Sequence, residues 1–199
     1  KLVPKAKQTA FILYGIYIIL SVIMFFCVLA GAMNVFDSLT TTFSTAGTGG
    51  FGNLNTSFAS YSPMRQTIVG IFMILFGINF NMYFLILAGR MKDGFKMTEV
   101  RRYLEIIGIA TLLIVIANRG IFDSLGDNIR SAFFTVASII TTTGFSTADF
   151  NLWPQFSKAI LVLLMMIGAC AGSTGGGIKV SRVILAFRLI REQIRAFLH

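Results

Sequence analysis

The sequence is poor in charge, in histidine and in cysteine. Only 13% of its 199 residues are charged, whereas 55% are hydrophobic, and the mean hydropathy is +0.79. A soluble domain carries about 25% charged residues, so this composition argues against a fold whose surface faces water. A soluble helical bundle is the alternative to an integral membrane protein, and the composition disfavours it.

The same scarcity removes the usual materials of a metal or catalytic site. The only histidine is His199, and Cys27 and Cys170 lie in separate apolar stretches far from any other ligand type. The cysteines are therefore interpreted as small buried hydrophobes rather than a disulfide or a metal pair. The apolar stretches also lack a histidine or a pair of carboxylates that could act as acid and base. We expect neither a zinc site, nor a covalently bound cofactor, nor an enzyme.

Apolar stretches at four places are candidates for membrane-spanning helices. A helix needs about 20 residues to cross the hydrocarbon core of a bilayer, and most of the stretches satisfy this. The third is the shortest and must include polar residues on both sides. The stretches are residues 9–31, 68–89, 106–117 and 159–171, the last extending to residue 189. The sequence therefore predicts an all-α integral membrane protein.

Most of the 17 lysines and arginines fall into three clusters. An even number of spans separates each pair of clusters, so all three lie on one side of the membrane. The positive-inside rule makes that side the cytoplasm and predicts cytoplasmic termini. Anionic lipid headgroups suffice to explain the charges, so we do not expect nucleic acid as a partner. The clusters are Lys1, Lys5 and Lys7; Arg90, Lys92, Lys96, Arg101 and Arg102; and Lys179, Arg182, Arg188, Arg191 and Arg195.

An internal repeat relates the two halves of the chain. A shift of 94 positions places a Thr-x-Gly-Phe motif at residues 48–51 over a second copy at residues 142–145. The same shift superposes the first span on the third and the second on the fourth. Membrane transport proteins are often built from such repeats. We expect one unit over residues 1–98 and an equivalent unit over residues 99–199.

Each unit contains a shorter, moderately apolar element between its long spans, at residues 37–46 and 129–140. A helix of about 11 residues is about 16 Å long, roughly half the hydrocarbon thickness, and cannot cross it. Crossing would also place the basic clusters on opposite sides. The elements are therefore predicted to be re-entrant, with Asp37 and Asp127 before their N-termini at the outer surface. The predicted architecture is two tandem helix–pore-loop–helix (M1-P-M2) repeats.

The Thr-x-Gly-Phe motif follows each short element at the expected depth of an ion filter. Non-helical backbone within a membrane must be buried or line a watery cavity. A ring of backbone carbonyls can replace the hydration shell of K⁺, and glycine permits the required backbone angles. An ordinary turn is the alternative, but two copies at equivalent places favour a filter. The candidate filter residues are Thr48, Gly49, Gly50, Phe51, Thr142, Thr143, Gly144 and Phe145.

A glycine-rich run at residues 168–177 interrupts the fourth span. Glycine costs about 1 kcal/mol relative to alanine within a helix, and the run predicts a broken final helix beneath the filter. Close helix packing through small residues is the alternative, although three successive glycines exceed what packing needs. The run also imitates a phosphate-binding loop, but Lys179 comes one residue late and no strand precedes it.

Several polar residues near these motifs have open interpretations. Lys179 and Arg182 could brace the break or extend to the cytoplasmic interface. Asn79 and Asn81, at the equivalent place in the first unit, suggest helix contacts or a cavity wall. Asp149 could concentrate cations at the mouth or cap a turn.

Taken together, these residues resemble the TrkH branch of the Trk/Ktr/HKT potassium transporters. The resemblance extends over essentially the whole chain. Members of that family carry four M1-P-M2 repeats around one pore, and this chain is similar to the second and third. The matching segments are residues 79–90, 132–134, 142–147, 153–154 and 172–180, with Arg182.

The resemblance implies that Gly50 and Gly144 supply filter carbonyls and that K⁺ is the transported ion. It also implies a bacterial cell membrane, homodimeric assembly and control by a cytoplasmic nucleotide-binding subunit of the TrkA type, so that nucleotide acts only through that partner. The glycine-rich run is implied to be an intramembrane gating loop. Its expected gating residues are Gly168, Gly172, Ser173, Thr174, Gly175, Gly176, Gly177 and Lys179.

Potassium transport through a carbonyl-lined filter is thus the favoured function. With two of four repeats, the chain is expected to be a fragment of a longer protein, and the alternative is that two copies complete a four-loop pore. A non-conducting fragment or assembly scaffold is the competing function, and membrane insertion without ion flux would reveal it.

Overall fold

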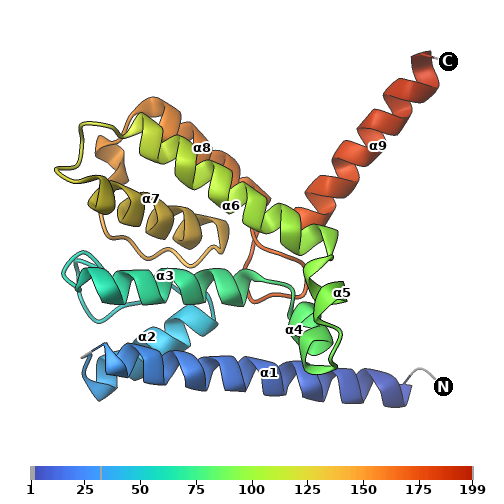
Figure 1. The fold of residues 1–199 in the computed structure, drawn as a ribbon, viewed down its shortest axis with the longest axis horizontal. Helices are drawn as coiled ribbons and strands as arrows, with labels where there is room; N and C mark the ends of the chain where they lie inside the picture. Colours follow the sequence, from blue (N-terminus) through green and yellow to red (C-terminus); the bar gives the residue numbers. More distant parts are fainter. Residues whose placement is uncertain (1–2, 32, 199) are drawn as a thin grey trace.

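The computed structural model describes residues 3–31 and 33–198, so Lys1 and His199 lie outside the described residues. All regular structure within these ranges is helical (Figure 1), which confirms the all-α class. The elements are α1 (Val3–Ala30), α2 (Val35–Ala46), α3 (Pro63–Gly77), α4 (Phe80–Leu87), α5 (Met91–Phe95), α6 (Thr98–Ala117), α7 (Leu125–Ile140), the 3₁₀ helix η1 (Phe150–Leu152), α8 (Gln155–Ile167) and α9 (Val180–Leu198).

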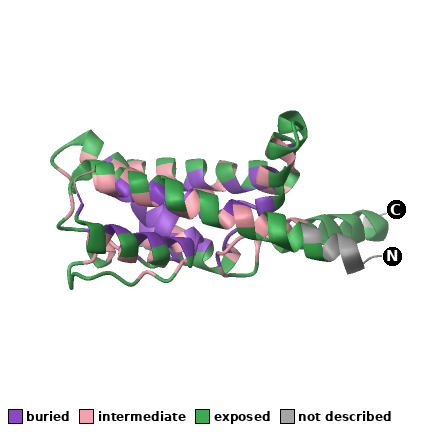
Figure 2. Cartoon of the chain, turned by 90° about the horizontal axis from the view of Figure 1, so that it is seen from below, coloured by how far each residue is buried: buried purple, intermediate pink, exposed green. Residues whose placement is uncertain are grey.

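Helices α1, α3, α6 and α8 make up the body of the molecule, with the short helices α2 and α7 between them, whereas α9 projects away from it (Figure 1). Helix α2 packs against α1 and α3, whereas α7 packs against α6, α8 and also α3. The contact between α3 and α7 therefore joins the first half of the chain to the second. Buried residues gather between the helices, and exposed residues cover the outer faces and α9 (Figure 2).

The segment Thr9–Ala30 of α1 is apolar on all sides rather than on one face. Of its large side chains, Met24 and Val28 are buried, whereas Phe11, Ile19 and Phe26 are more than half exposed. Exposed apolar side chains in such number suit a lipid environment better than water.

By length and apolar composition, α1 (Thr9–Ala30) can cross a bilayer alone, and α3 with α4 forms a second candidate if that bent pair is one span. The four spans expected from the sequence are thus not four continuous helices. Helix α8 has only 13 residues, and α6 carries Glu99, Arg101, Arg102 and Glu105 in its first two turns.

The second span differs most from the expectation of an unbroken helix across residues 68–89. Helices α3 and α4 meet at a bend of 88°. The side chain of Asn79 accepts a hydrogen bond from the N–H of Asn81 at 3.0 Å and so caps a new helix. Hydropathy remains high across the bend, but an N-cap asparagine favours a helix start at this point.

The short helices begin earlier than predicted, at Val35 and Leu125. Asn34 and Ser124 accept hydrogen bonds from the N–H groups of Asp37 and Asp127 at 2.7 and 3.0 Å. Both aspartates therefore lie within the first turn rather than before it, where a negative charge is favourable. Even α7, with 16 residues, is only about 24 Å long, less than the roughly 30 Å hydrocarbon core.

The cap of α7 generates a pH prediction. The Ser124 hydroxyl donates to Asp127 at 2.8 Å and Arg130 pairs with it at 2.5 Å, and these contacts hold the pKa of the carboxyl below its usual value. A carboxyl whose pKa is lower in the folded state stabilises the fold at pH values above its unfolded-state pKa. This stabilisation is lost as the pH falls through the folded-state pKa.

We therefore expect Asp127→Asn to lower the melting temperature of the detergent-solubilised protein slightly at neutral pH. The difference from the wild type should disappear below the depressed pKa of Asp127. Asp123→Asn, at an exposed carboxylate before the helix, is the matched control. A difference that persists in acid would contradict the role given to ionised Asp127.

Candidate functional site

The two Thr-x-Gly-Phe motifs have the same backbone conformation. Thr48 and Thr142 are left-handed, with φ of 50° and 59°, and Gly50 and Gly144 follow with φ of 70° and 91°. Because left-handed threonine is rare, its occurrence at both equivalent places shows that the repeat extends to the backbone of the motifs.

Each motif is the C-terminal cap of a short helix. In the second, the N–H of Thr143 donates to the carbonyl of Ser138 at 2.9 Å and that of Thr142 donates to Ile139 at 3.1 Å. This pair of bonds defines a Schellman motif, in which the left-handed position is normally glycine. In the first motif, the equivalent bonds run from Gly49 to Ser44 at 2.7 Å and from Thr48 to Thr45 at 3.1 Å.

The hydroxyl groups explain what threonine does where glycine would be less strained. A non-glycine residue in the left-handed region costs about 1–2 kcal/mol. The Oγ1 atom of Thr142 accepts a hydrogen bond from the N–H of Gly176 at 2.7 Å, and that of Thr48 lies 3.1 Å from the carbonyl oxygen of Thr174. Thr48 and Thr142 therefore both contact the glycine-rich loop.

Gly50 brings the two motifs together. A Cβ atom at this position would lie 1.9 Å from the carbonyl oxygen of Thr143, so only glycine permits the approach. A Cβ atom at Gly144 would meet nothing within 4 Å. The two glycines share a conformation. In the described chain, however, only Gly50 has the other motif next to its Cα atom.

The two phenylalanines of the motifs have different environments. Phe145 is 3% exposed and packs edge-on against Phe58, with their ring centroids 4.6 Å apart. Phe51, in contrast, is 81% exposed. The Ser138 hydroxyl also donates to the carbonyl of Phe145 at 2.6 Å. The side chain of Phe145 thus anchors the second motif in the core. Its packing partner Phe58 belongs to the first half of the chain.

The glycine-rich loop, residues 168–179, joins α8 to α9. It lies against the bend between α3 and α4. The N–H of Cys170 donates to the carbonyl of Gly77 at 3.0 Å, and the N–H of Phe80 donates to that of Gly172 at 3.1 Å. The loop also folds back on itself, because a Cβ atom at Gly168 would lie 2.4 Å from the carbonyl oxygen of Gly176.

The contacts of Lys179 and Asp149 favour one of the two interpretations that the sequence left open for each residue. The ammonium group of Lys179 donates to the carbonyl of Gly175, so this side chain braces the loop. Asp149 accepts hydrogen bonds from the backbone and side-chain nitrogens of Asn151 at 2.9 and 2.8 Å, which is the geometry of a turn cap.

Glu99 is a polar residue of this region that the sequence analysis did not single out. It lies in the first turn of α6, and its carboxylate accepts hydrogen bonds from Asn79, Ala171 and Ser181. An acid in the first turn of an apolar helix was the available signal, but the partners of Glu99 become its neighbours only in the folded chain.

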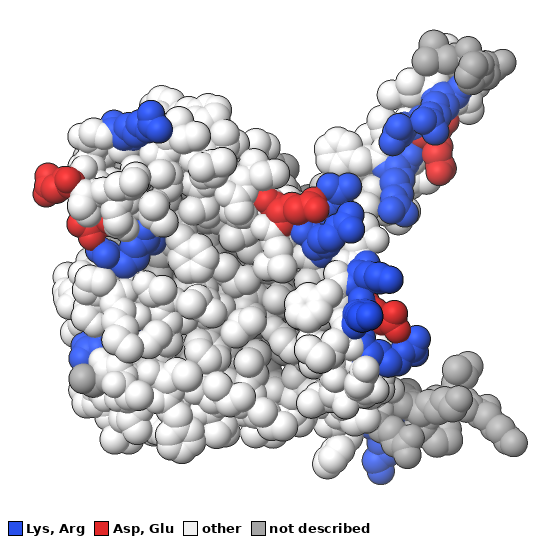
Figure 3. All heavy atoms as spheres, in the orientation of Figure 1, with Lys and Arg blue, Asp and Glu red and all other residues white. Residues whose placement is uncertain are grey.

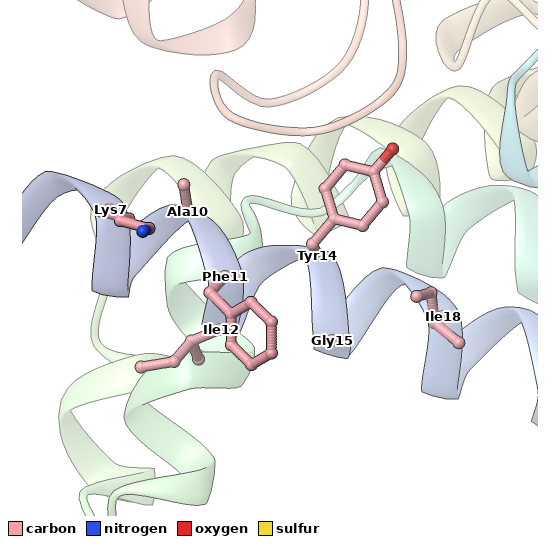
Figure 4. A pocket seen from close by; sticks show the side chains of 7 residues that line it. All are labelled: Lys7, Ala10, Phe11, Ile12, Tyr14, Gly15 and Ile18. Carbon is pink, nitrogen blue, oxygen red and sulfur yellow. The ribbon is translucent and has the colours of Figure 1, made fainter.

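A cavity of about 690 Å³ lies beside α1, away from these motifs (Figure 4). Its lining residues all come from α1 and are mostly apolar, without a convergent set of polar groups. This is the outer surface of a single helix, and we assign it no ligand. Its lining residues are Lys7, Ala10, Phe11, Ile12, Tyr14, Gly15 and Ile18.

Comparison with known proteins gives a consistent assignment. The sequence model of the TrkH family, described as a cation transport protein, matches residues 104–197. The Trk system potassium uptake proteins TrkH of Salmonella typhimurium and Escherichia coli K12 are 35% and 34% identical over 100% of this chain and 42% of their own length. The whole chain thus matches part of a TrkH protein.

A solved structure of the family extends the match to three dimensions. The crystal structure of the potassium transporter TrkH from Vibrio parahaemolyticus superposes with a TM-score of 0.92 at 30% identity, over 98% of this chain and 43% of that one. The likeness to TrkH confirms an all-α integral membrane fold. The chain spans less than half the length of the TrkH relatives it matches.

The geometry of Gly50 and Gly144 leads to a prediction for the 199-residue chain. Gly50→Ala and Gly144→Ala both place a side chain in the left-handed region, which costs about 1–2 kcal/mol. Only the first also creates a clash with a backbone oxygen, so Gly50→Ala should lower the melting temperature more. Thermal unfolding in detergent measures this, and equal losses would contradict the close approach of Gly50 to Thr143.

Proposed function

We propose that the chain supplies two filter segments of a K⁺-conducting pore. The observation that carries the proposal is the repeated left-handed threonine and glycine at the ends of two short helices that meet at Gly50. The ion-binding residues proposed are Thr48, Gly49, Gly50, Phe51, Thr142, Thr143, Gly144 and Phe145, and K⁺ is the transported ion.

The electrostatics of the short helices support a cation as the ligand. The C-terminus of an α-helix carries a partial negative charge of about half an elementary charge, and α2 and α7 both end at the motifs. Backbone carbonyls can then coordinate K⁺ without a ring of carboxylates. Replacement of several water ligands requires more such segments than two, so the pore needs further repeats.

We propose that residues 1–98 and 99–199 are two M1-P-M2 units of a four-repeat pore. Phe58 covers Phe145, but Leu152, at the position equivalent to Phe58, is 77% exposed. Phe51 is likewise exposed, and the space beside Gly144 is unoccupied in the described chain. These surfaces fit neighbouring units on both sides, supplied by the rest of a longer chain or by a second copy, and the assembled protein is proposed to be a homodimer.

The charge distribution supports an orientation in a bacterial cell membrane. Lysine and arginine gather over α5, the start of α6 and α9 at one end of the molecule (Figure 3). By the positive-inside rule, this end and both termini are cytoplasmic. It is also the end at which a TrkA-type nucleotide-binding regulatory subunit is proposed to bind, on the strength of the family resemblance.

We propose that the glycine-rich loop gates the ion path. Thr48 and Thr142 contact this loop, which supports a position on the path directly beneath the filter. The gating residues proposed are Gly168, Gly172, Ser173, Thr174, Gly175, Gly176, Gly177 and Lys179.

Rubidium uptake in cells that lack potassium uptake tests the function. The 199-residue chain and the longest open reading frame that contains it are compared. Uptake by the longer product alone is expected if the chain is half of a pore, and uptake by the short chain would show that two copies complete one. Insertion without uptake in either case would favour the scaffold alternative.

We further expect Gly144→Ser to lower the ratio of rubidium to sodium uptake in the active assembly, because a side chain at the filter disturbs carbonyl coordination. The matched control is Gly52→Ser, since Ser146 occupies the equivalent position in the second motif. An unchanged ratio in Gly144→Ser would count against the filter assignment.

A further inference from the structure

The carboxylate of Glu99 joins three segments that are distant in the sequence. One oxygen accepts hydrogen bonds from the N–H groups of Ala171 at 2.6 Å and Ser181 at 3.3 Å. The other oxygen accepts a hydrogen bond from the side-chain amide of Asn79 at 3.1 Å. A single side chain of α6 thus connects the bend between α3 and α4, the glycine-rich loop and the start of α9.

The backbone donors of this cluster have no helical partners of their own. Ala171 lies in the irregular loop, and Ser181 lies in the first turn of α9, where N–H groups have no carbonyl one turn before them. A carboxylate is a strong acceptor for such groups, and the helix N-terminus adds a favourable dipole. Glu99 therefore satisfies two main-chain donors that lipid could not satisfy.

The third contact explains why the residue is an acid rather than an amide. The side-chain oxygen of Asn79 already accepts the N–H of Asn81 and caps α4. This bond fixes the orientation of Asn79, so its NH₂ group faces Glu99. Both carboxylate oxygens must then be acceptors, a requirement that glutamine cannot meet.

The same loop is held on its other side by the filter. Thr174 and Gly176 contact the hydroxyl groups of Thr48 and Thr142. Ala171, the residue bound by Glu99, is only three positions before Thr174. A change at Glu99 is thus communicated to the filter contacts through a few residues of backbone.

We propose that Glu99 is the positioning residue that holds the glycine-rich loop beneath the filter, with Asn79 as its orienting partner. When this contact is broken, the loop leaves its place and the ion path opens more often. The consequence for ion flux rests on the proposed function, whereas the effect on the loop does not.

Cys170 provides a native probe of the loop position. It is fully buried, precedes Ala171 and is a free thiol. In the longest product containing the chain, with Cys27 and any other cysteine replaced by alanine, the rate of Cys170 modification by a membrane-permeant maleimide reports how often the loop opens.

Glu99→Gln and Asn79→Asp should each raise this rate about tenfold, since each places two donors or two acceptors opposite one another. The double variant Glu99→Gln/Asn79→Asp should restore the wild-type rate. In it, the new amide at position 99 donates to the new carboxylate at position 79, whose second oxygen still caps α4. Glu105→Gln, on the same helix but in an exposed pair with Arg102, is the control and should change nothing.

Unchanged rates in both single variants would overturn the proposal, and so would an equal increase in Glu105→Gln or a double variant no better than the singles. Rubidium uptake by the same variants distinguishes the effect of Glu99 on the loop position from its effect on ion flux. Faster uptake in the single variants and recovery in the double are expected. Faster modification without any change in uptake would leave Glu99 as the positioning residue and contradict the gating function of the loop.

Discussion

The structure depends on one constraint, which is that main-chain polar groups away from water must find partners within the protein. A continuous helix meets this requirement by itself, but the helical structure is interrupted between α3 and α4 and again between α8 and α9. The two interruptions lie against each other and exchange hydrogen bonds, as between Cys170 and Gly77 and between Phe80 and Gly172. Each irregular segment therefore satisfies some of the main-chain groups of the other.

The two Thr-x-Gly-Phe motifs are part of the same network. Their left-handed threonines are strained where glycine would be relaxed, and strain of this kind persists where surrounding contacts compensate it. The compensation here comes from hydrogen bonds to the loop, made by Thr48 with Thr174 and by Thr142 with Gly176. The two motifs, the glycine-rich loop and the helix bend consequently form one unit, to which Glu99 adds contacts with Asn79 and Ala171.

Much of this arrangement follows from local sequence signals. Long apolar runs predict the helices, the short elements are too short to cross, and the glycines of residues 168–177 predict an interruption before α9. The bend at Asn79 was missed because apolar residues continue on both sides of it, so hydropathy alone does not mark a new helix start. The earlier starts of α2 and α7 have a similar cause, since Asn34 and Ser124 act as caps only when the turn forms.

Other features have no local signal. Phe51 and Phe145 occupy identical motif positions, yet one is exposed and the other buried, because the packing partner Phe58 comes from the neighbouring half. The role of Glu99 likewise depends on donors far away in sequence. Contacts between segments thus decide what each copy of a repeated motif does.

The most direct test of the central claim is anomalous diffraction from crystals of the full-length protein grown with rubidium in place of potassium. We predict rubidium density on the pore axis, within coordination distance of the backbone carbonyls of residues 48–50 and 142–144. Well-ordered filter motifs without rubidium, or rubidium bound only elsewhere, would contradict the assignment of these motifs as an ion filter.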